Sequence, residues 1–297
     1  MGFWNHGAVL SPRRVAVAFL AIAALAGASC GELPDERASA RELAQAPPPT
    51  ESATPPPDAQ PPESPAPQEF LEIGESVASH EATPSAGGSL PAPESLRRWE
   101  WAVSTKDGRL DVYAAPGGAL ESQVNTLNPW DQRLVFPISK AQVVDGMAWY
   151  RVLLGVEPNG SKGWVRGDEV SFERMRHRVV IDLSDRMLRH YRNGRMRHHF
   201  SVGIGAPGTP TTPGRFFVWA HLNPRDASGP YGTYLLGLSG FSEVLSDWPG
   251  GGRMAIHGTA DPSDPGRRVS YGCARVHNPE MNRLRGIPMG TTVLIRA

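Results

Sequence analysis

Short apolar runs, separated by polar turn signals, recur along two parts of the chain. Between residues 98 and 173 these runs are rich in β-branched and aromatic residues and are bounded by turn signals such as "APGG" and "EPNGSKG". Runs of this kind are typical of β-strands. The pattern predicts a small all-β module over residues 98–173, with strands within "LDVYAAPGG" (110–118), "WYRVLL" (149–154) and "GWVRGDEV" (163–170).

The second part, residues 174–297, has the same strand-like pattern. "RVVIDLSDRMLRHYRNGRMRHHFSVGIG" predicts three strands, and Asn193-Gly194 is a strong signal for a two-residue hairpin turn because both positions need a positive φ. Asp185-Arg186 predicts a looser turn between the first two strands. Further strands are expected in "RFFVWAHL", "MAIHG" and "TTVLIRA". The fold class is therefore mainly β.

One short helix follows these strands in the second part. Asn278 can cap it, Pro279 suits its first position, and Gly286 can end it. Met281 and Leu284 would then share one face. The helix places Cys273 in the loop that precedes it.

Residues 1–30 have the pattern of an export signal. Arg13 and Arg14 precede the apolar run Val15–Ala28, which is shorter than the about 20 residues that span a membrane. "LAGASC" resembles a lipoprotein signal, in which Cys30 would carry a lipid anchor, and a signal removed without lipid attachment is the alternative. Either way, we expect the protein to be exported to the periplasm or cell envelope.

Residues 31–97 predict a disordered tether, and they differ in charge from the second β-rich part. Their Pro-, Ala- and Glu-rich composition cannot bury enough apolar surface to offset the entropy of ordering. They hold 12 acidic residues and three arginines, a net charge of −9, whereas residues 174–297 hold 17 arginines and eight acidic residues, a net charge of +9. The asymmetry favours an acidic partner such as a bacterial wall, with scattered solvated arginines as the alternative. No motif predicts nucleic acid as a partner.

The chain holds only two cysteines, Cys30 and Cys273. If Cys30 is removed or lipidated, Cys273 has no partner for an intramolecular disulfide. An unpaired cysteine in an exported protein is a candidate reactive thiol, and a small buried apolar residue is the alternative.

A reactive thiol needs a base, and His257 in "AIHGT" lies sixteen residues before Cys273. "IHGT", a polar loop and then "SYGCARV" together resemble the L,D-transpeptidase catalytic domain, also called the YkuD domain. "VGIGAPGTPTTPGRFFV", "LGLSGFSEVL" and "GIPMGTTVLIRA" extend the resemblance over roughly residues 176–297. Separately, "WYRV" followed by "GWV" makes residues 98–173 resemble a bacterial SH3-like β-barrel.

The resemblance to L,D-transpeptidases implies a role for each motif residue. Cys273 would be the nucleophile and His257 the general base, which later acts as an acid. Backbone amides of residues 271–273 would stabilise the oxyanion, in a loop that includes Ser270, Tyr271 and Gly272. Arg275 would either hold the loop or pair with a substrate carboxylate. Tyr231 and Tyr234 would line a substrate groove, with packing as the alternative.

The implied reaction is acyl transfer between peptidoglycan stem peptides through a thioester on Cys273, giving 3→3 cross-links. The resemblance implies no metal and no cofactor, and it implies inhibition by carbapenem-type β-lactams. An L,D-carboxypeptidase that uses water as acceptor is an alternative within the same chemistry.

Tyr271 departs from the family pattern, which has histidine at this position. Phenols stay protonated at neutral pH, so a tyrosine is no base there. His257, which the family assigns as the base, is kept, but a non-catalytic wall-binding protein with a decayed site stays an alternative. A zinc site formed by Cys273, His277 and His257 is disfavoured, because closed zinc sites have four ligands at recognisable spacings.

Overall fold

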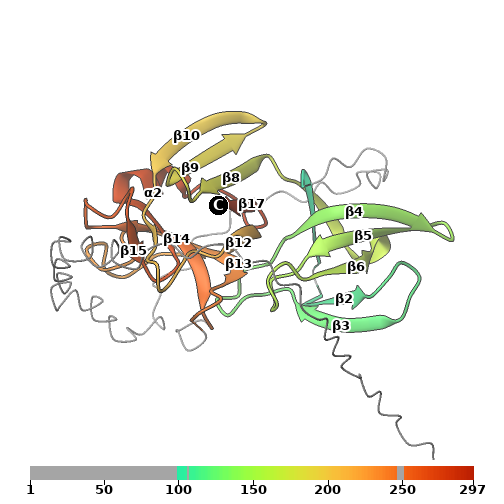
Figure 1. The fold of residues 1–297 in the computed structure, drawn as a ribbon. Coiled ribbons are helices and arrows are strands. Elements are labelled where there is room, and N and C mark those ends of the chain that lie inside the picture. Colours follow the sequence, from blue (N-terminus) through green and yellow to red (C-terminus); the bar gives the residue numbers. More distant parts are fainter. Residues whose placement is uncertain (1–98, 106, 246–250) are drawn as a thin grey trace, which may run out of the picture. The chain divides into compact units, whose positions relative to one another are not determined.

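The computed structural model describes residues 99–105, 107–245 and 251–297, and its strands form two large sheets and one small one (Figure 1). The predicted mainly β character is confirmed. The predicted export signal, Cys30 and the predicted tether lie outside the described residues. In the described part of the chain, no helix has the length and apolar character needed to cross a membrane.

The first sheet comes from residues 101–174 and has seven strands in the order β3-β2-β6-β5-β4-β1-β7. Its strands include the three predicted runs, which form β2, β5 and β6. The similarity of this region to SH3-like barrels stays a prediction. The strands are β1 (Trp101–Ser104), β2 (Arg109–Tyr113), β3 (Leu120–Asn125), β4 (Phe136–Val144), β5 (Met147–Leu153), β6 (Lys162–Arg166) and β7 (Ser171–Arg174), with a 3₁₀ turn, η2, at Gly167–Glu169.

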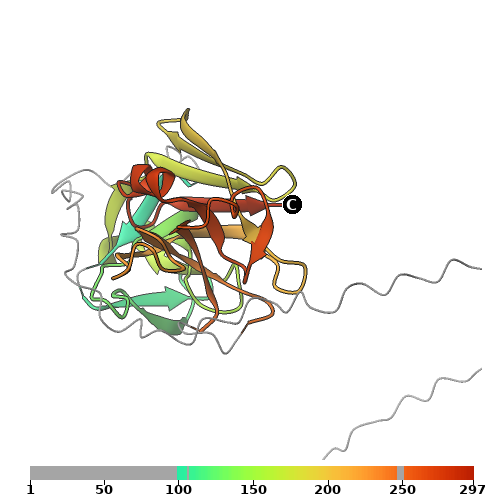
Figure 2. The ribbon, with the colours of Figure 1, turned by 90° about the vertical axis from the view of Figure 1, so that its left-hand side faces the viewer.

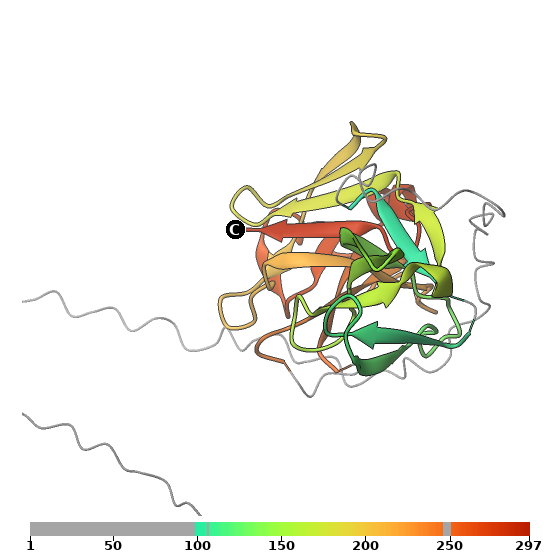
Figure 3. The same cartoon turned by 90° about the vertical axis from the view of Figure 1, so that its right-hand side faces the viewer.

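The second sheet has eight strands in the order β10-β9-β8-β17-β12-β13-β14-β16. The last strand of the chain, β17, lies between β8 and β12 (Figure 2 and Figure 3). A small parallel pair, β11 (Ile204–Gly205) with β15 (Arg268–Ser270), lies outside this sheet. The strands of the large sheet are β8 (His177–Asp182), β9 (Met187–Arg192), β10 (Arg195–Ser201), β12 (Gly214–Leu222), β13 (Leu235–Phe241), β14 (Arg253–Thr259), β16 (Ala274–His277) and β17 (Thr292–Arg296).

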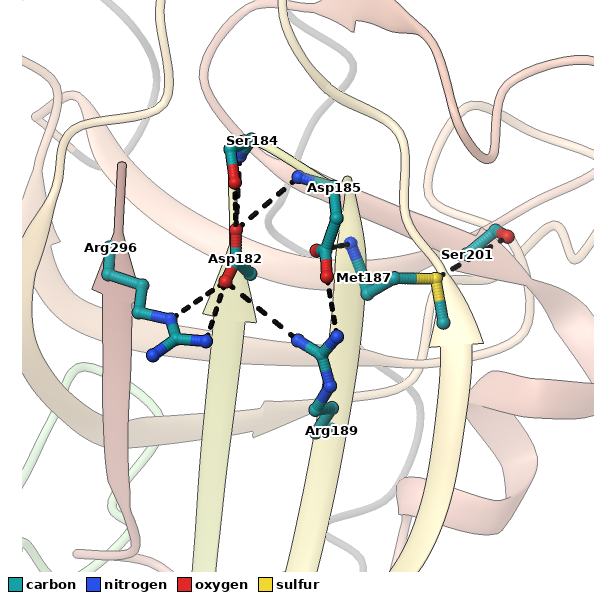
Figure 4. A network of polar contacts seen from close by, with 7 residues as sticks. All are labelled: Asp182, Ser184, Asp185, Met187, Arg189, Ser201 and Arg296. Carbon is teal, nitrogen blue, oxygen red and sulfur yellow. Dashed lines mark hydrogen bonds and ion pairs between the residues drawn. The ribbon is translucent and has the colours of Figure 1, made fainter.

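Local turn signals placed the hairpins of this sheet correctly. Asn193 and Gly194 have φ values of 50° and 74°, as the predicted two-residue turn between β9 and β10 requires. Between β8 and β9, the turn contains Arg186 at φ 51°. There Asp182 of β8 accepts hydrogen bonds from Ser184 and ion-pairs with Arg296 of β17 and with Arg189 of β9, which ties three strands together at one end (Figure 4).

The predicted helix exists, but its start differs from the prediction. Helix α2 spans Asn278–Leu284, with His277 rather than Asn278 as its N-cap and Pro279 at the second position. The backbone N–H of His277 donates to the Glu280 carboxylate at 3.2 Å. The side chain of Asn278 is engaged elsewhere, because its Oδ1 accepts the N–H of Thr233 at 2.9 Å. Because Asn278 is bonded to a residue distant in the chain, the N-cap lies one residue before the predicted position.

Two large apolar clusters form most of the core of the described residues, beside a small one of Ala102, Val135 and Met175. One lies within the second sheet and includes Met281 and Leu284 of α2, so the predicted apolar helix face is confirmed. The other joins both sheets, since Phe217, Trp219, Leu235 and Ala255 pack with residues from the first sheet. The residues from the first sheet and its loops are Val103, Leu110, Val112, Leu134, Phe136, Ile138, Tyr150, Val152, Leu153, Leu154 and Val165.

Candidate active site

Strands β14 and β16 bring the predicted nucleophile and base together. The two strands are parallel neighbours with Ile256 opposite Ala274 and His257 opposite Arg275. Continuing this register by one residue places Cys273, which directly precedes β16, beside Ala255. Backbone hydrogen bonding from Ala255 to the Cys273 thiol agrees with that position.

A pocket opens over these strands and contains both Cys273 and His257. Its other walls come from the loop before β13, the segment before β14 and the loop before β16. The lining residues are Pro230, Tyr231, Leu245, Gly252, Arg253, Met254, His257, Tyr271, Cys273 and Arg275. The sequence-predicted residues Tyr231, Tyr271 and Arg275 therefore share one pocket with the predicted catalytic pair.

His257 is almost completely buried, with 2% of its surface exposed. Its Nδ1 lies 2.7 Å from the carbonyl oxygen of Gly258, so a proton on Nδ1 is donated there and Nε2 is left as the basic nitrogen. Tyr231 packs edge-on against the imidazole at 5.2 Å. Burial, with a smaller effect from Arg275, lowers the pKa of His257 to about 3. The imidazole is therefore neutral at physiological pH.

Cys273 is a half-buried free thiol. Burial raises the pKa of the Cys273 thiol, while the backbone of Ala255 and the charge of Arg275 act in the opposite direction. The thiol is therefore protonated at neutral pH and needs a base to remove its proton as it attacks.

Ser270 fixes the loop that carries the nucleophile. Its buried hydroxyl donates to the carbonyl oxygen of Cys273 at 2.6 Å and accepts the N–H of Gly272 at 3.2 Å. The carbonyl oxygen of Ser270 accepts the hydroxyl of Thr209 at 2.9 Å. The Gly272 amide is thus bonded within the loop, and its role toward an oxyanion stays a prediction. Its φ of 108° lies in the region that favours glycine, so glycine suits this bend.

The contacts of Arg275 favour its role in holding the loop over the alternative, pairing with a substrate carboxylate. Its Nη1 donates to Asp264 at 3.1 Å, and the hydroxyl of Thr259 donates to the same carboxylate oxygen at 2.7 Å. Asp264 therefore ties the loop between β14 and β15 to both strands of the site. Sequence reasoning missed Asp264, since it is one of several polar residues in that loop and only the fold distinguishes it.

Of the two tyrosines predicted to line a groove, only Tyr231 does so. Tyr234 is 2% exposed and packs in the core of the second sheet, where its hydroxyl and Nδ1 of His221 are hydrogen-bonded at 2.7 Å. Its prediction as a substrate residue was wrong, and packing, the alternative, describes it. The difference follows from β13, which begins at Leu235 and draws the preceding residue into the core.

Arg253 is a charged pocket residue that sequence reasoning also missed. It lies on β14 four residues before His257, so both side chains point to the same face of the strand. The alternation of side chains along this strand is the sequence signal that could have placed Arg253 beside the site. For the zinc alternative, the described ranges contain no group of three His, Cys, Asp or Glu side chains placed to hold a metal ion.

Comparisons with known proteins agree with the motifs. Residues 176–295 match the family model of the L,D-transpeptidase catalytic domain, YkuD. The chain is 34% identical over 120 residues to a protein of Bacillus licheniformis assigned as the L,D-transpeptidase YkuD, and 31% identical over 121 residues to one of Bacillus subtilis. Each alignment covers 40% of this chain and 65% of the relative, so the chain spans less than two thirds of either relative's length.

Among solved structures, the catalytic domain of the E. faecium L,D-transpeptidase acylated by ertapenem aligns with 42% of this chain and 99% of its own length. The identity is 24% and the TM-score 0.32, a level of likeness that carries no argument about function. The sequence match is the stronger finding, and it confirms the predicted resemblance: residues 176–295 are similar to L,D-transpeptidase catalytic domains.

Proposed function

We propose that the protein is a peptidoglycan L,D-transpeptidase that forms 3→3 cross-links through a thioester on Cys273. The observation that carries the proposal is the shared pocket, in which a free thiol and a buried neutral imidazole lie on adjacent parallel strands. The match of residues 176–295 to the catalytic-domain family supports the substrate class.

In the first half-reaction, the Cys273 sulfur attacks the carbonyl carbon before the terminal D-alanine of a tetrapeptide stem. Nε2 of His257 accepts the thiol proton as the S–C bond forms. The proton then passes to the leaving nitrogen as the C–N bond breaks, so D-alanine departs and a thioester remains. The Cys273 amide is our candidate donor to the oxyanion, since Ser270 occupies the amide of Gly272.

In the second half-reaction, a side-chain amine of another stem attacks the thioester. His257 accepts a proton from that amine, and the thiol is regenerated when the C–S bond breaks. If water enters instead, the same steps give an L,D-carboxypeptidase. Product masses from a tetrapeptide stem, with and without an acceptor amine, separate these two outcomes.

Incubation with a carbapenem tests the proposal with an acyl donor that needs no second substrate. Intact-protein mass spectrometry should show one adduct on the wild-type chain and none on Cys273→Ala. No adduct on a folded wild-type chain would favour a non-catalytic wall-binding protein. In that case Tyr271→His would be the informative change, because an adduct that appears only in this variant would identify a decayed site.

Export of the protein, a lipid anchor at Cys30 and a wall-facing location belong to the same proposal. They rest on the amino-terminal sequence pattern alone. Labelling cells with radioactive palmitate would test the anchor: label on the wild-type chain and not on Cys30→Ala is the expected result, and an unlabelled wild-type chain contradicts it.

A further inference from the structure

Arg253 is held rigidly in the wall of the pocket. Its guanidinium carbon lies 3.8 Å from the ring centroid of Trp219 and 4.2 Å from that of Phe241. Its Nη2 donates to the carbonyl oxygen of Gly155 at 2.8 Å. Aromatic contacts on this scale and one fixed hydrogen bond leave the side chain few alternative positions.

Among the residues that the structure describes, Arg253 forms no ion pair with an Asp or Glu, and its buried Nη1 has no hydrogen-bond partner. Burial lowers the pKa of Arg253 to about 10, and Glu157 offsets this effect only in part. Burying a cation with an unused N–H costs free energy unless another group neutralises the charge and accepts the hydrogen bond.

Arg253 lies on the same face of β14 as His257, close to Cys273. Residues 253, 255 and 257 lie on one face of β14, and Cys273 lies beside Ala255. At about 3.3 Å per residue, Arg253 and His257 are each about 7 Å from Ala255 along the strand, in opposite directions. Ala255, the β14 neighbour of Cys273, therefore has His257 on one side and Arg253 on the other, and all three of Arg253, His257 and Cys273 line the same pocket.

The first sheet also contributes to this arrangement. Gly155, which accepts from Arg253, lies in the loop between β5 and β6. In the same loop, the Asn159 side chain bonds both the N–H and the carbonyl of Phe241, at 2.9 and 2.8 Å. One loop of the first sheet thus holds both the guanidinium and one of the rings that it stacks on.

Building on the proposed function, we infer that Arg253 binds a carboxylate of the acyl-donor stem peptide, and that the loop containing Gly155 and Asn159 positions it. Two carboxylates of the stem have the required chemistry, the terminal one of D-alanine and the side-chain one of a diaminopimelate third residue. A planar guanidinium with an unused N–H suits either. The first sheet is then part of the substrate site rather than a spacer.

Binding to the full chain with Cys273→Ala tests this inference without any chemical step. Calorimetry would compare a diaminopimelate tetrapeptide with two analogues, each amidated at one of the two carboxylates. One analogue should bind about 10- to 100-fold more weakly than the acid, and which one it is identifies the carboxylate. Adding Arg253→Met should abolish the difference, because methionine keeps the packing between the rings without the charge.

Arg178→Met is the matched control. Arg178 also stacks on an aromatic ring, Tyr191 at 4.7 Å, but lies outside the pocket, so the preference for the acid should be unchanged. If circular dichroism shows Arg253→Met to be unfolded, Arg253→Lys replaces it. A single ammonium cannot serve Gly155 and a ligand in the same geometry, so the preference should fall by about 3- to 10-fold.

Three results would overturn the inference: equal binding of the acid and both analogues, an undiminished preference in the folded Arg253 variants, or no binding of the acid at all. Failure of the proposed function has a different signature, since it would appear as a missing thioester on the Cys273 chain while the preference for the acid persisted.

Discussion

Cys273 and His257 share their pocket as two uncharged groups at neutral pH. Burial raises the pKa of the thiol and lowers that of the imidazole to about 3. A thiolate–imidazolium pair would need both shifts in the opposite directions. In the free protein the proton therefore stays on sulfur, and the proposed transfer of this proton to His257 would take place only as the thiol attacks.

The pH dependence of alkylation follows from this arrangement. Iodoacetamide reacts with the thiolate, and in a Cys30→Ser chain only Cys273 reports. Because the folded protein raises the pKa of this thiol, the alkylation rate should keep rising at pH values where the same chain unfolded in urea has reached its plateau. If the alkylation rate of the folded protein reached its plateau at a lower pH than that of the unfolded chain, the Cys273 thiol would not have the raised pKa that keeps it neutral at pH 7.

Removal of the base should slow acylation without removing the nucleophile. His257→Ala is expected to lower the rate of carbapenem acylation by about 10²- to 10⁴-fold, the usual contribution of a positioned general base. Stopped-flow fluorescence measures the rate, and the exposed His199→Gln is the control that should leave it unchanged. An unaltered rate in His257→Ala would eliminate its role as base.

The segment after β11 determines where Ser270 lies, and Gly205 is the position most sensitive to change. A Cβ there would lie 2.2 Å from the carbonyl oxygen of Thr209 and 2.4 Å from the backbone nitrogen of Thr211, whereas one at Gly208 would meet nothing within 4 Å. Gly205→Ala should therefore cost about 1–3 kcal/mol of unfolding free energy, and Gly208→Ala much less.

Urea titration of the two glycine variants measures this difference. Since Thr209 bonds the Ser270 carbonyl, Gly205→Ala should also slow carbapenem acylation. Equal stability of the two variants would mean that the segment yields easily and does not fix the nucleophile loop.

Three stacked histidines connect β8, β9 and β10. The ring centroids of His177 and His190 lie 5.1 Å apart, and those of His190 and His198 lie 5.6 Å apart. Burial, followed by the charges of its two histidine neighbours, lowers the pKa of His190 to about 4. Between about pH 6.5 and pH 4, His190 is thus protonated in the unfolded chain but neutral in the folded chain.

Stability should therefore fall as the pH is lowered through this window, with His190 contributing about 1–3 kcal/mol. His190→Phe keeps the stack and removes the titration, so its unfolding free energy should depend less on pH than that of the wild type. Urea titrations at pH 7 and pH 4.5 measure the difference. An identical pH dependence in both chains would show that His190 does not titrate as its burial requires.

Local patterns in the sequence predicted the strands, because side-chain alternation and the Asn193-Gly194 turn act over neighbouring residues. The motif formed by "IHGT" and "SYGCARV" also predicted that Cys273 and His257 lie in one site. The cap of α2, the burial of Tyr234 and the roles of Arg253 and Asp264 were missed or misplaced. The cap, the burial of Tyr234 and the role of Asp264 depend on contacts with residues distant in the chain, which no local period contains. For Arg253 the alternation along β14 gave its face, but not its contacts with Trp219, Phe241 and Gly155.

The two sheets share an apolar cluster and are joined by several hydrogen bonds. Asn128 donates to the carbonyl oxygen of Trp219 at 2.9 Å, and Gln132 exchanges two bonds with the backbone of His221. Because residues of both sheets pack in one apolar cluster, we expect the first sheet to contribute to the stability of the second.

Asn159→Ala should weaken this coupling. The change removes both hydrogen bonds to the Phe241 backbone and should cost about 1–3 kcal/mol of unfolding free energy, whereas Asn125→Ala, at an exposed position on β3, should cost little. Scanning calorimetry of the two variants makes the comparison. If Asn159→Ala were as stable as Asn125→Ala, the loop would not couple the sheets.

Acid-quenched intact-protein mass spectrometry with a tetrapeptide donor would detect a thioester between Cys273 and a peptidoglycan stem. We expect a mass gain equal to the donor minus D-alanine, located on the peptide that contains Cys273, and its loss when an acceptor amine is added. No mass gain in the wild-type chain while free D-alanine accumulates, or the same gain in Cys273→Ala, would contradict the proposed thioester.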